Sequence, residues 1–172
     1  MATGQILRDA TGQLLRDADG KLKLWAPSVW HDTYAKSWDV LDTPGGAETM
    51  QVLWNWSTLS RTRMFIRPPN TSGGGTLWLY VTYLYSGWSV GVNVHEITAD
   101  WDEATCCWTN QPSVGSLLIS NQRILSSGWS SFALPASTYG YRFSEVQSTS
   151  DKREALIASS EHSDSSKRPY WA

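Results

Sequence analysis

Basic clusters, long apolar runs and cysteines are all scarce in this 172-residue chain. Fourteen basic residues against sixteen acidic ones give a net charge of -2, and the lysines and arginines form no block. The electrostatic signature of a nucleic-acid-binding protein is therefore missing. No stretch reaches the ~20 apolar residues of a membrane span, and the first residues lack the basic and apolar regions of a secretion signal. We expect neither a nucleic acid nor a membrane as a partner, and a single domain with its own core.

The two cysteines, Cys106 and Cys107, are neighbours in the sequence and lie just before Trp108. Adjacent Cα atoms are ~3.8 Å apart, below the ~4.4 Å that a disulfide usually needs, so these thiols cannot bridge one another without strain. With three histidines and no second cysteine pair, the chain also lacks a ligand set for zinc. We predict a strand over residues 105–108, in which Cys106 is a small buried side chain and Cys107 a candidate surface thiol.

Amphipathic helical periodicity is missing as well, whereas alternation with a period of two is frequent. Residues 76–84 alternate between two faces, and a Ser-Gly turn leads from them to an apolar run at 90–94, which predicts a β-hairpin of two long strands. Loops rich in Gly, Pro, Asn and Ser separate further predicted strands at 50–56, 61–67, 105–108, 116–119, 129–134, 139–143 and 154–159. This pattern predicts an all-β fold, an antiparallel β-sandwich or jelly roll.

The first 27 residues repeat with a period of eight: GQILRDAT, GQLLRDAD and GKLKLWAP begin at Gly4, Gly12 and Gly20. Each unit predicts a short strand and a turn. Such an arm buries little by itself, so it needs a surface on its own domain, on a symmetry mate or in a larger assembly; a meander at one edge of the main sheet is the alternative. We therefore divide the chain into an N-terminal β-repeat arm (1–27) for docking or oligomerisation and a jelly-roll domain (28–172). The apolar positions of the arm are Ile6, Leu7, Leu14, Leu15, Leu22 and Leu24.

Several motifs of the second part occur in a characteristic order: HDTY at 31–34, RTRMFIR at 61–67, TLWLYV at 76–81, ITADWDEATCCWTNQPSVGS at 97–116 and ASSEHSDSSKRPY at 158–170. In these motifs the chain resembles the DNRLRE (disaggregatase-related) domains, jelly-roll modules similar to carbohydrate-binding modules. Members are usually parts of large extracellular or surface proteins. The resemblance implies a structural role for the motif residues Trp101, Asp102, Glu103, Trp108 and Pro112.

Eleven tryptophans and seven tyrosines suit sugar-stacking surfaces, subunit interfaces and simple packing in a β-sheet, and these three uses stay open. Arginines at positions 61, 63 and 67 suit the bidentate binding of an acidic polysaccharide. The candidate residues for binding a carbohydrate or a partner are Trp30, Trp38, Trp54, Trp56, Trp88, Trp129, Arg61 and Arg63, with Arg67 beside them.

Residues for catalysis are few. Asp100, Asp102 and Glu103 could form an acid–base pair for a glycoside, but acids at the entrance of a strand more often bond to backbone amides. The sequence His162-Ser163-Asp164 does not by itself assemble a catalytic triad. We expect no catalytic site, no metal and no cofactor, with a structural calcium ion as an alternative. Oxygen ligands for such an ion are available from Asp39, Asp42, Glu48 and Asp151.

Three functions follow, in decreasing order of support. The first is a phage virion component, a capsid decoration or fibre protein whose arm docks to the particle and whose jelly roll faces outward; it predicts a homo-oligomer, with a trimer favoured, and a place on the virion surface. The start at Met without an export signal is what we expect for such a protein. The second is a carbohydrate-binding module of a secreted or cell-surface protein. The third is a polysaccharide lyase or glycosidase.

Overall fold

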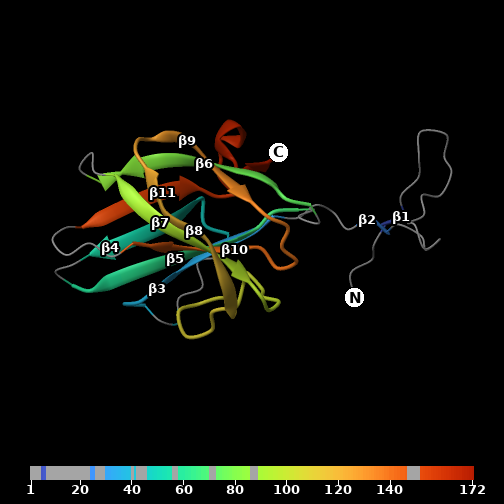
Figure 1. Cartoon of the computed structure of the whole chain (residues 1–172), viewed down its shortest axis with the longest axis horizontal. Coiled ribbons are helices and arrows are strands. Elements are labelled where there is room, and N and C mark those ends of the chain that lie inside the picture. Colours follow the sequence, from blue (N-terminus) through green and yellow to red (C-terminus); the bar gives the residue numbers. More distant parts are fainter. Residues whose placement is uncertain are drawn as a thin grey trace.

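Figure 1 shows a computed structural model of the chain. It describes residues 5–6, 24–25, 30–39, 41, 46–55, 58–69, 73–85, 89–146 and 152–172, of which 5–6, 24–25 and 54 are described by their backbone alone. Within these ranges no helix has the length and apolar character needed to cross a membrane. A 3-10 turn, η2 (Ser165–Lys167), lies near the C-terminus.

Ten antiparallel strands form one curled sheet, so the prediction of an all-β sandwich of the jelly-roll type is confirmed. The strands are β3 (His31–Lys36), β4 (Thr49–Asn55), β5 (Ser60–Arg67), β6 (Gly75–Leu84), β7 (Val90–Ile97), β8 (Val114–Ile124), β9 (Gly128–Leu134), β10 (Tyr141–Glu145), β11 (Arg153–Ala158) and β12 (Tyr170–Trp171). Most of them coincide with the alternating runs in the sequence, because one face of each strand lies in the core and the other faces outward.

The sheet curls into two layers at β5 (Figure 1). Its order is β12-β6-β11-β4-β5-β10-β7-β8, with β9 on the other edge of β6 and β3 on the other edge of β5. On one edge, β5 pairs with β4 along residues 60–62 and with β10 along 63–66. Strands β9, β6, β11 and β4 therefore make one layer, and β3, β5, β10, β7 and β8 make the other.

The main core fills the space between the layers. Leu77, Leu79 and Val81 of β6 are fully buried, and the rings of Phe132 and Phe143 meet edge to face with centroids 5.0 Å apart. At about 25 cal/mol per Å² of apolar surface removed from water, this burial is the main stabilising contribution. The opposite face of each strand is left available for other contacts.

A second, smaller core lies on the outer face of β5. Met64 and Ile66 point into the main core, so the alternating Phe65 points outward and packs with Ala35, Ile97, Trp101 and Cys106. The cover is the long loop between β7 and β8, residues 98–113, drawn in yellow at the bottom of Figure 1. A backbone bond from Thr98 N–H to Ser113 O, at 3.0 Å, closes this β7–β8 loop at its base.

Three local predictions are wrong. Strands β6 and β7 do not pair as a hairpin: β6 pairs with β9, β11 and β12, and β7 with β8 and β10. Their apolar faces line the core from opposite layers, so the connection between them crosses from one layer to the other. Residues 105–108 form turns instead of a strand, and strand alternation therefore does not apply to the cysteines. Cys107 is 6 % exposed and is buried, not a surface thiol.

In the N-terminal repeat, β1 (Gln5–Ile6) and β2 (Leu24–Trp25) pair with one another in a separate two-stranded sheet. They come from the first and the third octad. Neither strand pairs with the ten-stranded sheet among the described residues. The predicted arm positions Leu7, Leu14, Leu15 and Leu22 lie outside the described residues, as do the side chains of Ile6 and Leu24.

Candidate functional site

Four aromatic side chains gather on the outer face of the first layer, over β6, β9 and β12. Trp78 and Tyr80 lie on β6, at the positions that alternate with the buried leucines. Across the strands, Tyr170 of β12 is directly opposite Trp78, and Trp129 of β9 is directly opposite Tyr80. Two cross-strand pairs on adjacent positions of one face thus bring the four rings together. We call this group the aromatic platform.

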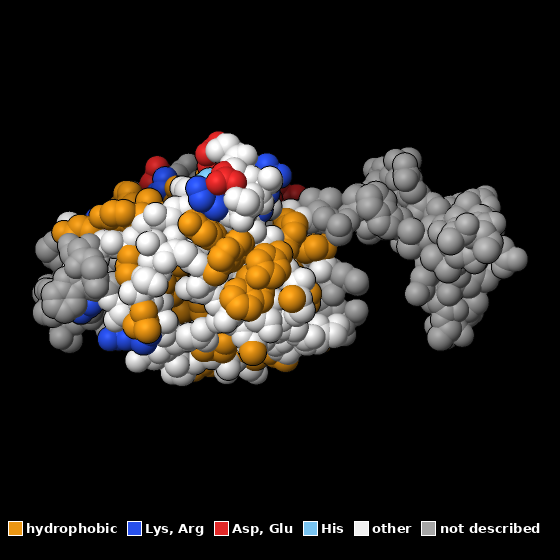
Figure 2. Space-filling model, turned by 90° about the horizontal axis from the view of Figure 1, so that it is seen from above, with side chains coloured by type: hydrophobic (Ala, Val, Ile, Leu, Met, Phe, Trp, Pro, Cys, Tyr) orange, Lys and Arg blue, Asp and Glu red, His pale blue; other side chains and the backbone are white. Residues whose placement is uncertain are grey.

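The rings of the aromatic platform contact one another directly. Trp78 and Tyr170 are stacked with centroids 5.7 Å apart and an interplanar angle of 10°. Trp129 joins them by edge contacts to Tyr80 at 5.2 Å and to Tyr170 at 5.1 Å. Trp129 is nevertheless 41 % exposed and Tyr170 43 % exposed. Figure 2 views the molecule from this side, with apolar and aromatic side chains gathered beside a group of charged ones.

One pair of opposite charges, Lys167 and Asp164, borders the aromatic platform. The Lys167 ammonium lies 5.7 Å from the centroid of the Tyr80 ring and 2.9 Å from an oxygen of Asp164. Asp164 also caps η2, because its carboxylate accepts the Ser166 N–H at 3.0 Å. Hydrogen bonds from Ser166 and Lys167 hold the pKa of Asp164 well below its usual range. The border therefore carries both signs of charge and favours neither anionic nor cationic ligands.

Among the aromatic residues that the sequence put forward, the structure brings Trp129 into the platform. Trp30 packs against the main core, and Trp38 is 51 % exposed in the turn after β3. Trp56, Trp88 and the side chain of Trp54 lie outside the described residues. Sequence reasoning did not put forward Trp78, Tyr80 or Tyr170. The alternation of 77–84 did place the first two on one face, but the register between strands was needed to join them to Trp129 and Tyr170.

The predicted arginines lie on β5, on the outer face of the second layer, where Arg63 and Arg67 contact the β7–β8 loop. Arg63 donates to Gln111 Oε1 at 2.8 Å, and its guanidinium lies 4.6 Å from the centre of the Trp108 ring. Arg67 donates to Asp100 at 2.6 Å and to the Trp101 carbonyl at 3.1 Å. Arg61 is partly buried on the same strand. Arg63 and Arg67 thus make structural contacts within the second layer, away from the platform strands.

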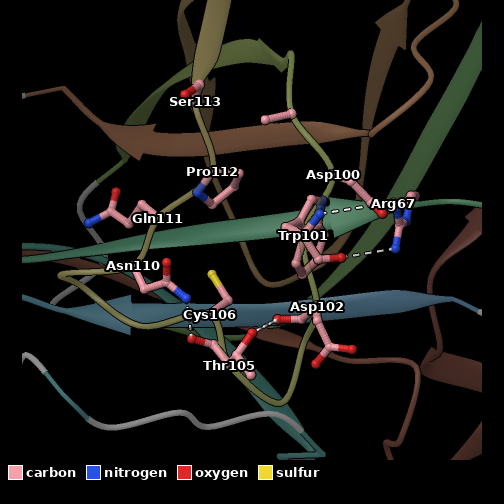
Figure 3. Close-up of a pocket in the computed structure, with 11 residues that line it drawn as sticks. Arg67, Asp100, Trp101, Asp102, Thr105, Cys106, Asn110, Gln111, Pro112 and Ser113 are labelled. Atoms are coloured by element: carbon pink, nitrogen blue, oxygen red, sulfur yellow. Dashed lines mark hydrogen bonds and ion pairs between the residues drawn. The ribbon is translucent and has the colours of Figure 1, made fainter.

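The β7–β8 loop encloses a surface pocket of ≈ 540 Å³, shown in Figure 3. Arg67 and the loop residues 99–102, 105–106 and 110–113 line it. Trp101 is buried below it and donates through its indole N–H to Tyr139 O at 2.8 Å. The residues of the motif at 97–116 therefore build this loop. Pro112 lines the pocket.

Asp100 and Asp102, two acidic residues of the β7–β8 loop, accept hydrogen bonds from backbone N–H groups of the loop. Asp102 accepts the Ala104 N–H at 2.8 Å, which shapes the turn. The Arg67 guanidinium and the Trp101 N–H hold the pKa of Asp100 below its ordinary value. A carboxyl that stays ionised is a poor general acid. Burial raises the pKa of Cys106 to about 12, so its thiol, which points into the pocket in Figure 3, stays protonated.

In the closing loop, the hydroxyl of Ser163 donates to Glu48 Oε2 at 3.2 Å, while His162 Nδ1 accepts the Asp164 N–H at 3.1 Å. These contacts organise the turn before η2 and leave Ser163 bonded to a residue other than the histidine. A catalytic triad needs a nucleophile and a base within hydrogen-bond reach of one another. The observed contacts of Ser163 and His162 do not provide this arrangement.

The structure also brings together three carboxylates that could hold a metal ion: Asp32, Glu103 and Glu161. Burial, and after it the charge of Glu161, raises the pKa of Asp32 to about 8. Of the four residues that the sequence put forward for calcium, Asp42 and Asp151 lie outside the described residues. Asp39 and Glu48 are described by the structure, and neither belongs to this cluster.

No protein-family model matches the chain, and no curated protein matches it either. The resemblance to the DNRLRE domains thus stays a prediction.

Proposed function

We propose that the chain is a non-catalytic binding protein whose aromatic platform binds a polysaccharide. The observation that carries the proposal is the exposure of Trp129 and Tyr170 within a group of four mutually contacting rings. Aromatic side chains with one apolar face in the sheet and another toward solvent are suited to stacking on flat apolar surfaces, such as the faces of sugar rings. An exposed aromatic group of this kind marks an interaction surface.

The charges around the platform favour a neutral polysaccharide. Lys167 is paired with Asp164, and the cationic Arg63 and Arg67 hold the β7–β8 loop on the other layer. Acid–base catalysis has little support in the described loop, because Asp100 and Asp102 are bonded to the residues that shape it. Stacking and hydrogen bonding are therefore the contributions that we expect to dominate binding.

The test is the binding of the full chain to a panel of neutral and acidic polysaccharides, followed in native gels that contain each polymer. We expect Trp129→Ala and Tyr170→Ala to weaken binding to the recognised polymer by about tenfold or more, because central aromatic contacts dominate such interfaces. Trp38→Ala is the matched control, since Trp38 is exposed in a turn of the other layer. Retention of full affinity by both platform variants, or binding confined to acidic polymers, would contradict the proposal.

The predicted role as a phage capsid decoration or fibre protein stays a proposal about the arm. The pairing of β1 with β2 in a separate sheet supports an arm that is available for docking. A glycan-binding domain with such an arm suits an adhesion protein on a particle, with a carbohydrate-binding module of a secreted protein as the alternative. Because Trp and Tyr are also enriched in subunit interfaces, the platform itself could be buried between copies. The mass of the Trp129→Ala variant in solution distinguishes glycan binding by the platform from burial of the platform between copies.

A further inference from the structure

Three carboxylates from distant parts of the chain converge at one place outside the aromatic platform. Asp32 lies in β3, Glu103 in the β7–β8 loop, and Glu161 in the segment that follows β11. Each of the three offers an oxygen, and these oxygens all lie within 4.8 Å of one another. Carboxylates this close repel each other strongly unless a positive charge lies between them.

Neighbouring groups orient each carboxylate and leave an oxygen for another partner. The Ser160 N–H donates to Asp32 Oδ2 at 2.8 Å, and the Ser160 hydroxyl donates to Glu161 Oε1 at 2.6 Å. The Gly46 N–H donates to Glu103 Oε1 at 2.9 Å. Bonds of this kind fix the direction of metal-binding carboxylates in metalloproteins.

Asp32 is the residue that points to a ligand. It is 2 % exposed, and its Oδ1 atom has no hydrogen-bond partner among the described residues, although Oδ2 has one. A buried carboxylate oxygen without a partner is costly, so native proteins usually satisfy it with a donor, a water molecule or a cation. His31 lies at the edge of the cluster, with its Nδ1 4.0 Å from Glu103 Oε2.

We propose that Asp32, Glu103 and Glu161 bind a calcium ion. The donors are all carboxylate oxygens, which suit a hard cation, and the group contains no thiolate or imidazole ligand that would favour zinc. Calcium–oxygen distances of about 2.4 Å place two ligands on opposite sides of the ion about 4.8 Å apart. The separations among the three carboxylates therefore allow one calcium ion to contact all of them. Glu103 and Glu161 both reach solvent, so water can complete the coordination shell.

The ion would connect three segments that the sheet does not join directly. Glu103 belongs to the β7–β8 loop that covers Phe65, while Glu161 belongs to the turn before η2. Binding would therefore stabilise the loop and the turn on β3. This inference goes beyond the polysaccharide proposal and does not depend on it, because none of the three ligands belongs to the aromatic platform.

The experiment is a calorimetric titration of the EDTA-treated, dialysed full chain with calcium chloride, together with thermal unfolding with and without the metal. We expect one site per chain with a Kd of about 1 mM or tighter. We expect a rise in Tm of about 5–10 °C at a calcium concentration about 100-fold above the Kd. Magnesium chloride should give a smaller rise at equal concentration, because Mg²⁺ demands shorter bonds and gives up its water reluctantly.

Variants keep the test independent of whether a single substitution impairs folding. Asp32→Asn and Glu161→Gln should each weaken calcium binding by at least about tenfold and abolish most of the rise in Tm. Asp39→Asn is the matched control, an exposed acid outside the cluster that should retain calcium binding. If the unmodified chain does not bind calcium, the proposal is overturned. A proton shared by Asp32 and Glu161 in place of the ion would give this result. Stronger binding of magnesium, or full binding by Asp32→Asn, would do the same.

Discussion

At the scale of single residues, Glu145 at the end of β10 is an ionisable group that the fold holds in an unfavourable environment. It is buried, and its Oε2 atom has no hydrogen-bond partner among the described residues. Burial raises the pKa of its carboxyl from 4.5 to about 7, although Arg63 and other arginines act in the opposite direction. The folded state therefore retains a proton on this residue in a pH range where the unfolded state has lost it.

This difference predicts a dependence of stability on pH. Because the folded-state pKa is the higher one, the contribution of Glu145 is fully present below pH 4.5 and is lost as the pH rises to about 7. The shift corresponds to about 3 kcal/mol in the free energy of unfolding. We expect Glu145→Gln, which cannot ionise, to gain stability over the unmodified chain by up to about 3 kcal/mol as the pH is raised through this range. Urea denaturation at the two ends of the range measures the gain.

The matched control for Glu145→Gln is Glu48→Gln, which changes an exposed acid. Asp32, whose pKa is raised to about 8, makes stability fall with rising pH over the same range, so the comparison must be between variants at one pH and not between pH values alone. An equal gain in the control, or a gain for Glu145→Gln that does not change with pH, would contradict the assignment.

At the scale of strands and loops, close approach between neighbouring strands determines where side chains are tolerated. Gly140 precedes β10 with a φ of +91°, and a Cβ atom there would clash with the Ile66 carbonyl and lie 2.8 Å from Arg67 Cα. Gly128, at the start of β9, also has a positive φ, of +105°, but a Cβ atom would meet nothing within 4 Å. A substitution at Gly128 therefore introduces backbone strain alone, whereas a substitution at Gly140 introduces both strain and a steric clash.

We expect Gly128→Ala to lower the free energy of unfolding by about 1–2 kcal/mol, the cost of a positive φ in a residue with a Cβ atom. Gly140→Ala should lower it by at least about 3 kcal/mol, because a clash with backbone atoms of β5 adds to the same strain. Denaturation with guanidinium chloride gives both values. Equal losses in the two variants would show that β5 does not approach Gly140 as closely as the structure indicates.

Alternation within a strand was readable from the sequence, whereas pairing between strands was not. The runs at 50–56, 61–67 and 76–84 became strands because their alternate side chains are buried in one core. The same reasoning failed at 105–108, where Asp102 directs the chain into turns by accepting bonds from the Thr105 and Cys106 amides. It failed again at the β6–β7 connection, since a Ser-Gly turn signal does not reveal that the next strand lies in the opposite layer.

Sites assembled from distant segments are also hard to predict from the sequence, because they depend on how strands and loops pair in the fold. Trp129 was predicted as a binding residue from its type, but its partners Trp78 and Tyr170 depend on the register of β9 and β12 against β6. The carboxylates Asp32, Glu103 and Glu161 likewise come from three segments far apart in the chain. Candidates for calcium chosen from the sequence were simply acids in loops, since nothing in their spacing indicates which of them meet in the fold.

At the scale of the whole molecule, the sheet of β3 to β12 forms without any pairing to β1 or β2 in the described structure. Its core residues all lie between residues 35 and 158. The domain thus has its own core and carries all four rings of the aromatic platform. The arm can then be removed without breaking the pairings that position the aromatic platform.

Deleting residues 1–27 should therefore change the Tm of the domain by no more than about 1–2 °C, since the pairings of the ten-stranded sheet stay in place. If the arm is an assembly device, the full chain should form a trimer or a larger species and the truncated chain a monomer. Light scattering coupled to size exclusion measures both masses. A truncated chain that unfolds at a much lower temperature would instead show that the arm stabilises the domain.

The platform variant completes this comparison, because an oligomer can form through either surface. A full chain with Trp129→Ala should keep the mass of the unmodified oligomer while losing affinity for the polysaccharide, if the arm assembles and the platform binds glycan. Loss of the oligomer in Trp129→Ala but not in the truncated chain would assign the four rings to a subunit interface, where Trp and Tyr are also enriched. Measuring mass and polysaccharide binding on the same two variants therefore tests the functions of the arm and of the platform independently.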